Sequence, residues 1–342
     1  VVTATSHGYS NGDRVFISGV VGMTEVNNRE FTVANKTTNT FELSGVDSSG
    51  FTTYSSGGTS GKIVEVTTTY SVTEIFELNF AQSADVLFIA HKSHEPDKLT
   101  RTSTTSFTLT DIDFTDGPYL DENISTTTIY ASAATGTGIN LVASAATFES
   151  GHVGALFRFR EIIETSHDAW AASTSYAQND TVRNAGNVYK KTNAGSHTSG
   201  TTAPVHTTGT ETYGSIDWEF QHSGPGFVKI TGFTSSTQVA ADVKSTLPAS
   251  VVGSSNPTTK WSEGAFSSVR GFPKALAFYE ERLFFAGTTH QPQSIFGSVS
   301  ADFENHSPGT NDDDAVNITI ASDQVNVIKH LLPGRFLQIL TT

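Results

Sequence analysis

The sequence predicts an all-β protein of several domains, and three observations support this. Only 16% of the 342 residues are charged, while Thr, Ser, Gly and Asn fill much of the remainder. Thr and aromatic residues favour pleated, half-buried surfaces, and Gly and Asn supply turns. Short runs such as "DRVFISGV", "GKIVEVTTTY" and "FVKITGF" carry apolar residues at alternate positions between turn-forming residues, as strands do. Helical periodicity is almost absent.

The order of these runs predicts four regions. They are a small β module at 1–63, the first part of a body at 64–166, an inserted β module at 167–222, and the second part of the body at 223–342. The first module ends in the Gly/Ser-rich "SSGGTSGK", and the insert differs from both neighbours in its high content of Thr, Asn, Gly and His. We expect at most one or two short helices, and the best candidate lies between 236 and 247, where Val239, Ala240 and Val243 share a helical face.

The net charge and the absence of cysteine exclude several classes of function. The net charge of −14 argues against a protein that grips nucleic acid, which needs a basic surface, but not against one that lets DNA pass. The chain has no cysteine, so disulfides and thiol chemistry are excluded. No apolar run approaches the roughly 18 residues of a membrane helix. Because the chain starts at Val1 without an initiator Met or a signal segment, we expect it to be a piece of a longer protein.

The densest apolar run, "PKALAFYEERLFFAG", has Glu280, Glu281 and Arg282 at its centre. Two apolar stretches separated by two polar residues predict a hairpin with the glutamates at its tip. Adjacent carboxylates cannot flank one glycosidic bond, so the pair is not a hydrolase site. Arg282 is expected to anchor a carboxylate or a carbonyl near the start of the second strand.

Three segments are candidates for metal binding because they are rich in acidic residues or histidine. "DIDFTDGPYLDE", residues 111–122, has the acid spacing of a calcium loop, but Asp116 occupies the position that needs Gly. Asp312 to Asp314 are three adjacent carboxylates that repel one another, and His91 and His94 lie in a segment that reads as a turn. We predict polar loops at all three, with no metal and no cofactor. No nucleophile elbow, phosphate loop or other catalytic motif occurs, so no enzyme is predicted.

Four aromatic residues of the insert are the remaining candidates: Trp170, Tyr176, Tyr189 and Trp218. A module of about 55 residues needs large side chains to build a core. Exposed rings would instead stack on sugars, so core packing and glycan binding both remain open.

Two longer segments resemble the tail nozzle proteins of short-tailed bacteriophages, also called tail tubular protein B or stabilisation proteins. Residues 77–123 carry "AQSADV" and a following P-x-x-L-x-R, and residues 260–331 carry "RLFFAGT", "QPQ" and "GSVSADF" in the family's order. The resemblance covers well over half the chain, counting the span these segments enclose. It implies a β-propeller-like body, incomplete in this chain because the family normally continues beyond "LLPGRFLQILTT".

The resemblance also implies partners and a place. The expected protein is a hexameric ring in the virion tail, assembled in the host cytoplasm. It would sit below the tail adaptor protein, dock tail fibres or spikes, and conduct double-stranded DNA during ejection without binding it specifically.

The two modules resemble other families. Residues 3–60 are similar to small β modules of phage tails that bear a distant likeness to a ubiquitin-activating-enzyme domain, without that enzyme's activity. Residues 168–220 resemble chitin-binding modules through W-x5-Y-x3-D-x-V-x3-G-x-x-Y, which points to host-surface glycan as a further partner. The alternatives to a nozzle are therefore a tailspike-like depolymerase, which needs two converging carboxylates, and a glycan-binding adhesin, which needs exposed aromatic rings.

Overall fold

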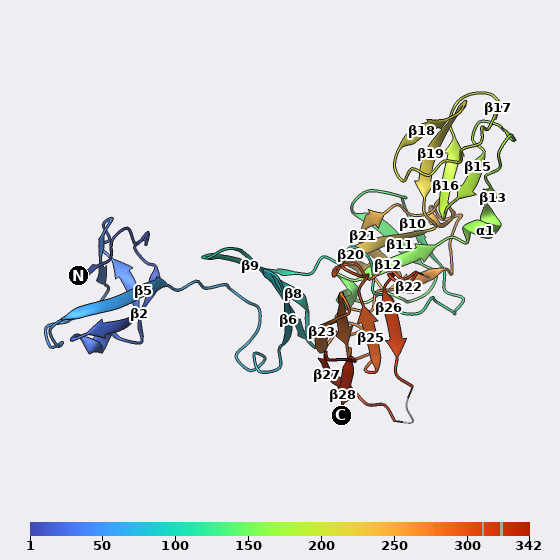
Figure 1. Cartoon of the computed structure of the whole chain (residues 1–342). Coiled ribbons are helices and arrows are strands. Elements are labelled where there is room, and N and C mark those ends of the chain that lie inside the picture. The colour runs from blue at the N-terminus through green and yellow to red at the C-terminus, as the bar shows by residue number, and fades with distance from the viewer. Residues whose placement is uncertain (310, 322–323) are drawn as a thin grey trace. The chain divides into compact units, whose positions relative to one another are not determined.

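The computed structural model describes residues 1–309, 311–321 and 324–342 (Figure 1). Strands hold 46% of the residues, and no helix among the described residues reaches seven residues. The prediction of an all-β, multi-domain chain is confirmed, and the several small sheets are consistent with a propeller-like β body. Of the helices in the described part of the chain, none has the length and apolarity to cross a membrane.

By compactness the chain divides into two units. One comprises residues 1–72, 82–87 and 98–110, and the other comprises 73–81, 88–97 and 111–342. One four-stranded sheet has the order β6-β7-β8-β9. Its strands are β6 (Asn79–Ser83), β7 (Val86–His91), β8 (His94–Ser103) and β9 (Ser106–Asp111).

The N-terminal module is a five-stranded sheet in the order β1-β4-β3-β2-β5. Its elements are β1 (Val2–Thr3), β2 (Arg14–Val21), the 3₁₀ helix η1 (Thr24–Val26), β3 (Arg29–Ala34), β4 (Thr40–Leu43) and β5 (Ser56–Lys62). Val15 and Ile17 alternate with exposed neighbours along β2, as a half-buried strand requires. They join Phe31, Val33 and Phe41 in a core that belongs to this module alone.

A six-stranded sheet, β10-β11-β21-β20-β12-β22, lies in the second unit. Its strands are β10 (Ile129–Ala131), β11 (Ile139–Ala143), β12 (Leu156–Arg160), β20 (Pro225–Ser235), β21 (Gln238–Ser245) and β22 (Trp261–Glu263). The 3₁₀ helices η2 (Ser150–His152) and η3 (Ala249–Val251) flank it. One face buries Leu141, Phe157 and Phe159 in the largest core of the chain.

The helix predicted between 236 and 247 is wrong, because these residues form β21, hydrogen-bonded to β20 and β11. Val239 and Val243 are four residues apart, a spacing that puts two side chains on one face of a helix and equally on one face of a strand. Val239 and Ala241 are fully buried at a spacing of two, and β-branched Val favours the strand once partners lie on both sides.

The insert folds around a second sheet, β13-β15-β16-β19-β18, with the short pair β14-β17 beside it (Figure 1). Its elements are α1 (Ile163–Ser166), β13 (Asp168–Ala169), β14 (Ser175–Tyr176), β15 (Thr181–Asn184), β16 (Asn187–Lys191), β17 (His197–Thr198), β18 (Thr210–Tyr213) and β19 (Ile216–His222). β12 ends at Arg160 just before it and β20 begins at Pro225 just after it, and these two strands pair with each other. The insert therefore leaves the six-stranded sheet and returns to the neighbouring strand.

The C-terminal strands form a four-stranded sheet, β23-β24-β25-β26, and a separate hairpin, β27-β28. They are β23 (Ala275–Tyr279), β24 (Arg282–Ala286), β25 (Ser294–Gly297), β26 (Val316–Thr319), β27 (Ile328–Leu332) and β28 (Gln338–Thr341). The hairpin predicted around Glu280 and Glu281 is confirmed, since Tyr279 pairs with Arg282 across a two-residue turn. Both glutamates are exposed, at φ of 46° and 59°.

This turn makes a stability prediction. Positive φ at both central residues strains Glu, whereas Asn-Gly is the preferred pair for such a turn. We expect the double change Glu280→Asn and Glu281→Gly to stabilise the hairpin by about 1 kcal/mol, measured by urea denaturation. Changing both residues to Gln removes the charge and keeps the strain, so this control should have no comparable effect. A stabilisation equal in both double variants would assign the effect to charge.

Candidate functional site

The four aromatic residues proposed for glycan binding lie in or on the core of the insert. Tyr189 and Trp218 are completely buried, Tyr176 is 8% exposed, and Trp170 is half-buried against the same cluster. The Tyr176 and Trp218 rings meet edge to face, with centroids 5.2 Å apart. The Tyr189 hydroxyl donates to the His206 carbonyl at 2.9 Å. A buried ring offers no face to a sugar, so in this conformation the stacking hypothesis depends on Trp170 alone.

The acidic residues of segment 111–122 turn toward separate basic partners. The ion pairs are Lys229–Asp113 at 3.3 Å, Lys244–Asp113 at 3.6 Å, Arg160–Glu122 at 2.8 Å and Lys260–Glu122 at 2.9 Å. The Asp116 carboxylate accepts a hydrogen bond from the Tyr119 hydroxyl at 2.6 Å. Calcium needs these oxygens to converge on one point, so the segment is the polar loop that the missing Gly predicts.

The backbone carbonyls of Asp312, Asp313 and Asp314 contact a cationic side chain, that of Arg282. The Arg282 side chain is 9% exposed, and its guanidinium donates to four backbone carbonyls. The acceptors are Ser298 O at 2.6 Å, Asp312 O at 2.5 Å, Asp313 O at 3.3 Å and Asp314 O at 2.6 Å. The expectation that Arg282 anchors a carbonyl is confirmed. Through these bonds to backbone carbonyls, the guanidinium holds the 312–314 loop against the start of β24.

A buried ionic network joins β22 to η2, and no sequence motif indicates it. Glu263 is 6% exposed, and its carboxylate lies 2.8 Å from His152 Nε2 and 2.6 Å from the Arg270 guanidinium. The Glu149 amide donates to His152 Nδ1 at 2.8 Å, which leaves the proton on Nε2, facing Glu263. Burial alone would raise the pKa of Glu263, but His152 and Arg270 outweigh it, and the pKa is lowered. Each member has its partner inside the network, which marks it as structural.

Glu95 is a half-buried carboxyl that lies near enough to Asp111 to feel its charge. Burial first, and then the charge of Asp111, raises the pKa of Glu95, as in the acid of a glycosidase. The space beside Glu95 is a cavity of about 40 Å³. Gly154 also lines it, and approaches so tightly that a Cβ there would lie 2.5 Å from Glu95 Oε1. Such a cavity holds about one water molecule and no sugar ring.

A wider cleft of about 460 Å³ lies along the loop after β9, β12 and β22. Three cationic side chains line it: Arg158, Arg160 and Lys260. Its carboxylates come from the adjacent residues Asp121 and Glu122, and Glu122 is already paired with two of the cations. Adjacent acids with one of them neutralised do not provide the opposed acid and base of glycoside hydrolysis.

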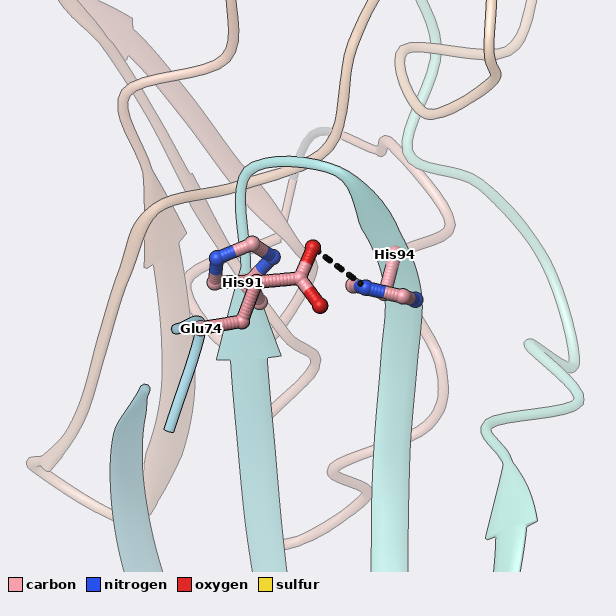
Figure 2. A group of neighbouring side chains, drawn as sticks. All are labelled: Glu74, His91 and His94. Carbon is pink, nitrogen blue, oxygen red and sulfur yellow. Dashed lines mark hydrogen bonds and ion pairs between the residues drawn. The ribbon is translucent and has the colours of Figure 1, made fainter. Parts of the chain in front are cut away.

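Histidine and glutamate side chains gather at the turn between β7 and β8 (Figure 2). His91 ends β7 and His94 begins β8, so their rings lie on one face of the hairpin with centroids 5.1 Å apart. Figure 2 shows the Glu74 carboxylate reaching between the two rings, and Glu74 Oε1 lies 3.1 Å from His94 Nε2. Glu77 adds a further carboxylate, 3.8 Å from His91 Nε2. Sequence spacing identified the two histidines but not the glutamates.

A second group of this kind lies where the insert joins the six-stranded sheet. The Glu161 carboxylate lies 3.3 Å from His167 Nε2 and 3.2 Å from His222 Nε2. The Gly224 amide donates to His222 Nδ1 at 3.1 Å, so His222 keeps its proton on Nε2, the nitrogen that faces Glu161. This group is largely shielded from solvent, since the side chains of His222 and Glu161 are only 4% and 9% exposed.

The N-terminal module is similar to a known protein family. No curated protein matches the chain. Residues 1–63 match the family described as the ubiquitin-activating enzyme E1 FCCH domain. The match spans the five-stranded sheet and 63 of the 342 residues, so it describes this module and not the whole chain.

Proposed function

We propose that the chain is part of a bacteriophage tail nozzle, a structural protein that forms a ring, conducts DNA during ejection and docks fibres or spikes. The proposal starts from the resemblance of residues 77–123 and 260–331 to this family. It involves no turnover, no cofactor and no catalytic residue.

The observation that carries the proposal is that parts of these two segments, far apart in the sequence, pack together within the second compact unit. Phe88 packs edge to face on Phe278, with centroids 5.7 Å apart. The Asn79 side chain donates to the Lys274 carbonyl at 2.8 Å. Further links join the loop after β9 to residues of the 260–331 segment: Thr115 N to Glu304 O at 2.9 Å, Leu120 N to Glu263 O at 2.8 Å, and a bridge between Asp116 and Asn305. Joint packing of the matching segments is what a shared family body requires.

The two modules fit the same proposal as decorations of that body. Residues 1–63 have their own core, and so does the insert, with the Tyr189–Trp218 cluster at its centre. An element with its own core can be added to a strand connection at little cost to the parent fold. On this account the modules face partners outside the ring, and the FCCH-like module carries no ubiquitin-activating chemistry.

The two alternatives have less support. A depolymerase needs opposed carboxylates beside a space for sugar, and neither the Glu95 cavity nor the wider cleft combines both. An adhesin that binds glycan through aromatic stacking has the half-buried Trp170 as its one partly open ring among the four proposed residues.

The acidic balance yields a prediction about DNA. With 34 acidic and 20 basic residues, the protein offers few lysine or arginine contacts that release counterions from duplex DNA. We expect it to bind duplex DNA more weakly than about 10⁻⁴ M at physiological salt, the weak end of non-specific binding. Fluorescence anisotropy of a labelled duplex measures this. A dissociation constant near 10⁻⁶ M would contradict a conduit that lets DNA slide through.

The experiment that tests the assignment is to locate the protein in virus particles. An antibody raised against residues 167–222, bound to gold, should label the tail tip of intact particles. Labelling of capsids, or absence of the protein from purified particles by mass spectrometry, would overturn the proposal.

A further inference from the structure

The group at the β7–β8 turn has the ligand set of a transition-metal site. Two imidazoles and one carboxylate are a recurrent set for Zn²⁺, with the fourth position left to water or another ligand. The three side chains each offer an atom within 4.8 Å of the other two. All three residues lie in the second compact unit, in ranges 73–81 and 88–97. We propose that Glu74, His91 and His94 bind a divalent transition ion such as Zn²⁺.

The geometry is close to what the ion needs. Ligand bonds of about 2.0–2.1 Å in a tetrahedron place ligand atoms roughly 3.3 Å apart. Glu74 Oε1 and His94 Nε2 already lie 3.1 Å apart. Their side chains are 28% and 23% exposed, so both can adjust by the roughly 1 Å that closes the site around His91. This exposure also gives the ion a path to the site.

The electrostatics favour a cation. Two carboxylates lie at the histidine rings, Glu74 at 3.1 Å from His94 Nε2 and Glu77 at 3.8 Å from His91 Nε2. Glu77 supplies a second carboxylate nearby, held by Lys92 at 2.6 Å. Glu77 is placed either to complete the coordination or to orient the His91 ring from the outer shell.

The group at Glu161 is the weaker candidate and therefore the matched control. Its His222 Nε2 carries a proton, set by the 3.1 Å hydrogen bond from the Gly224 amide to Nδ1. His91 Nδ1 accepts a similar, longer contact from the Ser93 amide at 3.3 Å, so the position of the proton does not by itself separate the two groups. The Glu161 group is nearly closed to solvent, whereas the Glu74 group is open on one side.

A bound ion would join the stretch before β6 to the β7–β8 hairpin. Glu74 lies outside regular structure, and the histidines belong to paired strands. The ion would therefore tie a loop to a sheet within one unit, which is the role of a structural metal. Stability should then rise with the concentration of free metal.

The test titrates the full chain with Co²⁺, whose visible absorption reports inner-shell nitrogen and oxygen ligands, followed by displacement with Zn²⁺. We expect one equivalent to bind. His94→Ala and Glu74→Gln should each weaken affinity about 100-fold or more, since loss of an outer-shell partner alone costs 10–100-fold. Both positions are partly exposed, so the variants should fold, as circular dichroism will show.

His167→Ala is the control and should bind Co²⁺ like the parent. Zn²⁺ should raise the unfolding temperature of the parent and of His167→Ala, and leave that of His94→Ala unchanged. Equal binding by the parent and His94→Ala would overturn the proposal, because the ion would then sit on other histidines. Loss of binding in His167→Ala would overturn it too.

Discussion

Replacing Arg282 by Met is expected to destabilise the C-terminal sheet by about 3–5 kcal/mol. The guanidinium is the buried donor to four carbonyls, three of them at 2.6 Å or less. Charge-assisted hydrogen bonds contribute about 1.5–3 kcal/mol each, and a carbonyl left buried without a donor adds a desolvation cost. The loss of two such bonds is enough to account for the effect.

The consequence should be local first. The Ser298 and Asp314 carbonyls lie on separate stretches of chain, so the loop at 312–314 should detach from β24 before the sheet unfolds. Hydrogen-exchange mass spectrometry of peptides spanning 282–298 measures this better than a global transition, because the chain has several cores. Arg282→Lys keeps the charge but not the planar fork, and should fall between the parent and Arg282→Met.

Arg101 provides the matched control. It is 52% exposed and pairs with Asp85, so Arg101→Met should cost at most about 1 kcal/mol. A similar cost for both substitutions would show that Arg282 acts as a surface residue and that the carbonyl cluster has no special weight.

Acidification is expected to destabilise the body through His306. The ring is 2% exposed and packs against Phe114 and Phe285, with centroids 5.5 and 5.8 Å away. Burial lowers the pKa of His306 to about 3. In the unfolded chain a histidine has a pKa near 6.5, so between about pH 6.5 and pH 3 the unfolded state binds the extra proton. Stability is therefore full above pH 6.5 and falls as the pH drops, by up to about 1.4 kcal/mol per pH unit.

The measurement is urea denaturation of the parent and of His306→Leu between pH 7 and pH 5, above the range in which carboxylates titrate. His91 and His222, whose pKa values are also lowered by burial, contribute to the parent's slope. The difference in slope between the two proteins therefore isolates His306. His290→Leu changes an exposed histidine and should retain the parent's slope. An unchanged slope in His306→Leu would mean that the ring reaches water before the body unfolds.

Sequence patterns predicted correctly those elements whose conformation depends on residues close together in the chain. The hairpin at 275–286 follows from two apolar runs and two polar residues, because the turn and its flanking strands are neighbours in the chain. The β-rich composition likewise predicted the fold class. The prediction of a helix at 236–247 was wrong because residues four apart lie on one face of a helix and also on one face of a strand. The strands that pair with this segment, β11 and β20, decide the outcome, and the segment's own pattern does not reveal them.

The sites depended on distant residues, and sequence reasoning missed them for that reason. His91 and His94 were visible as a pair, but Glu74 joins them from a stretch without a recognisable spacing. Glu263 and His152 are 111 positions apart, so no motif announces their hydrogen bond. In the insert, composition alone left core and glycan binding open, and burial placed Trp218 in the core.

The central claim, that the protein builds a tail nozzle, is tested most directly by its assembly. Heterologous contacts between identical subunits close into a ring when the rotation permits. The sample is the longest form that the gene encodes, purified and imaged by electron microscopy with class averages computed without imposed symmetry. The account predicts closed rings with six-fold symmetry and a central channel. A homogeneous population of single subunits, at concentrations that match those in an infected cell, would contradict it.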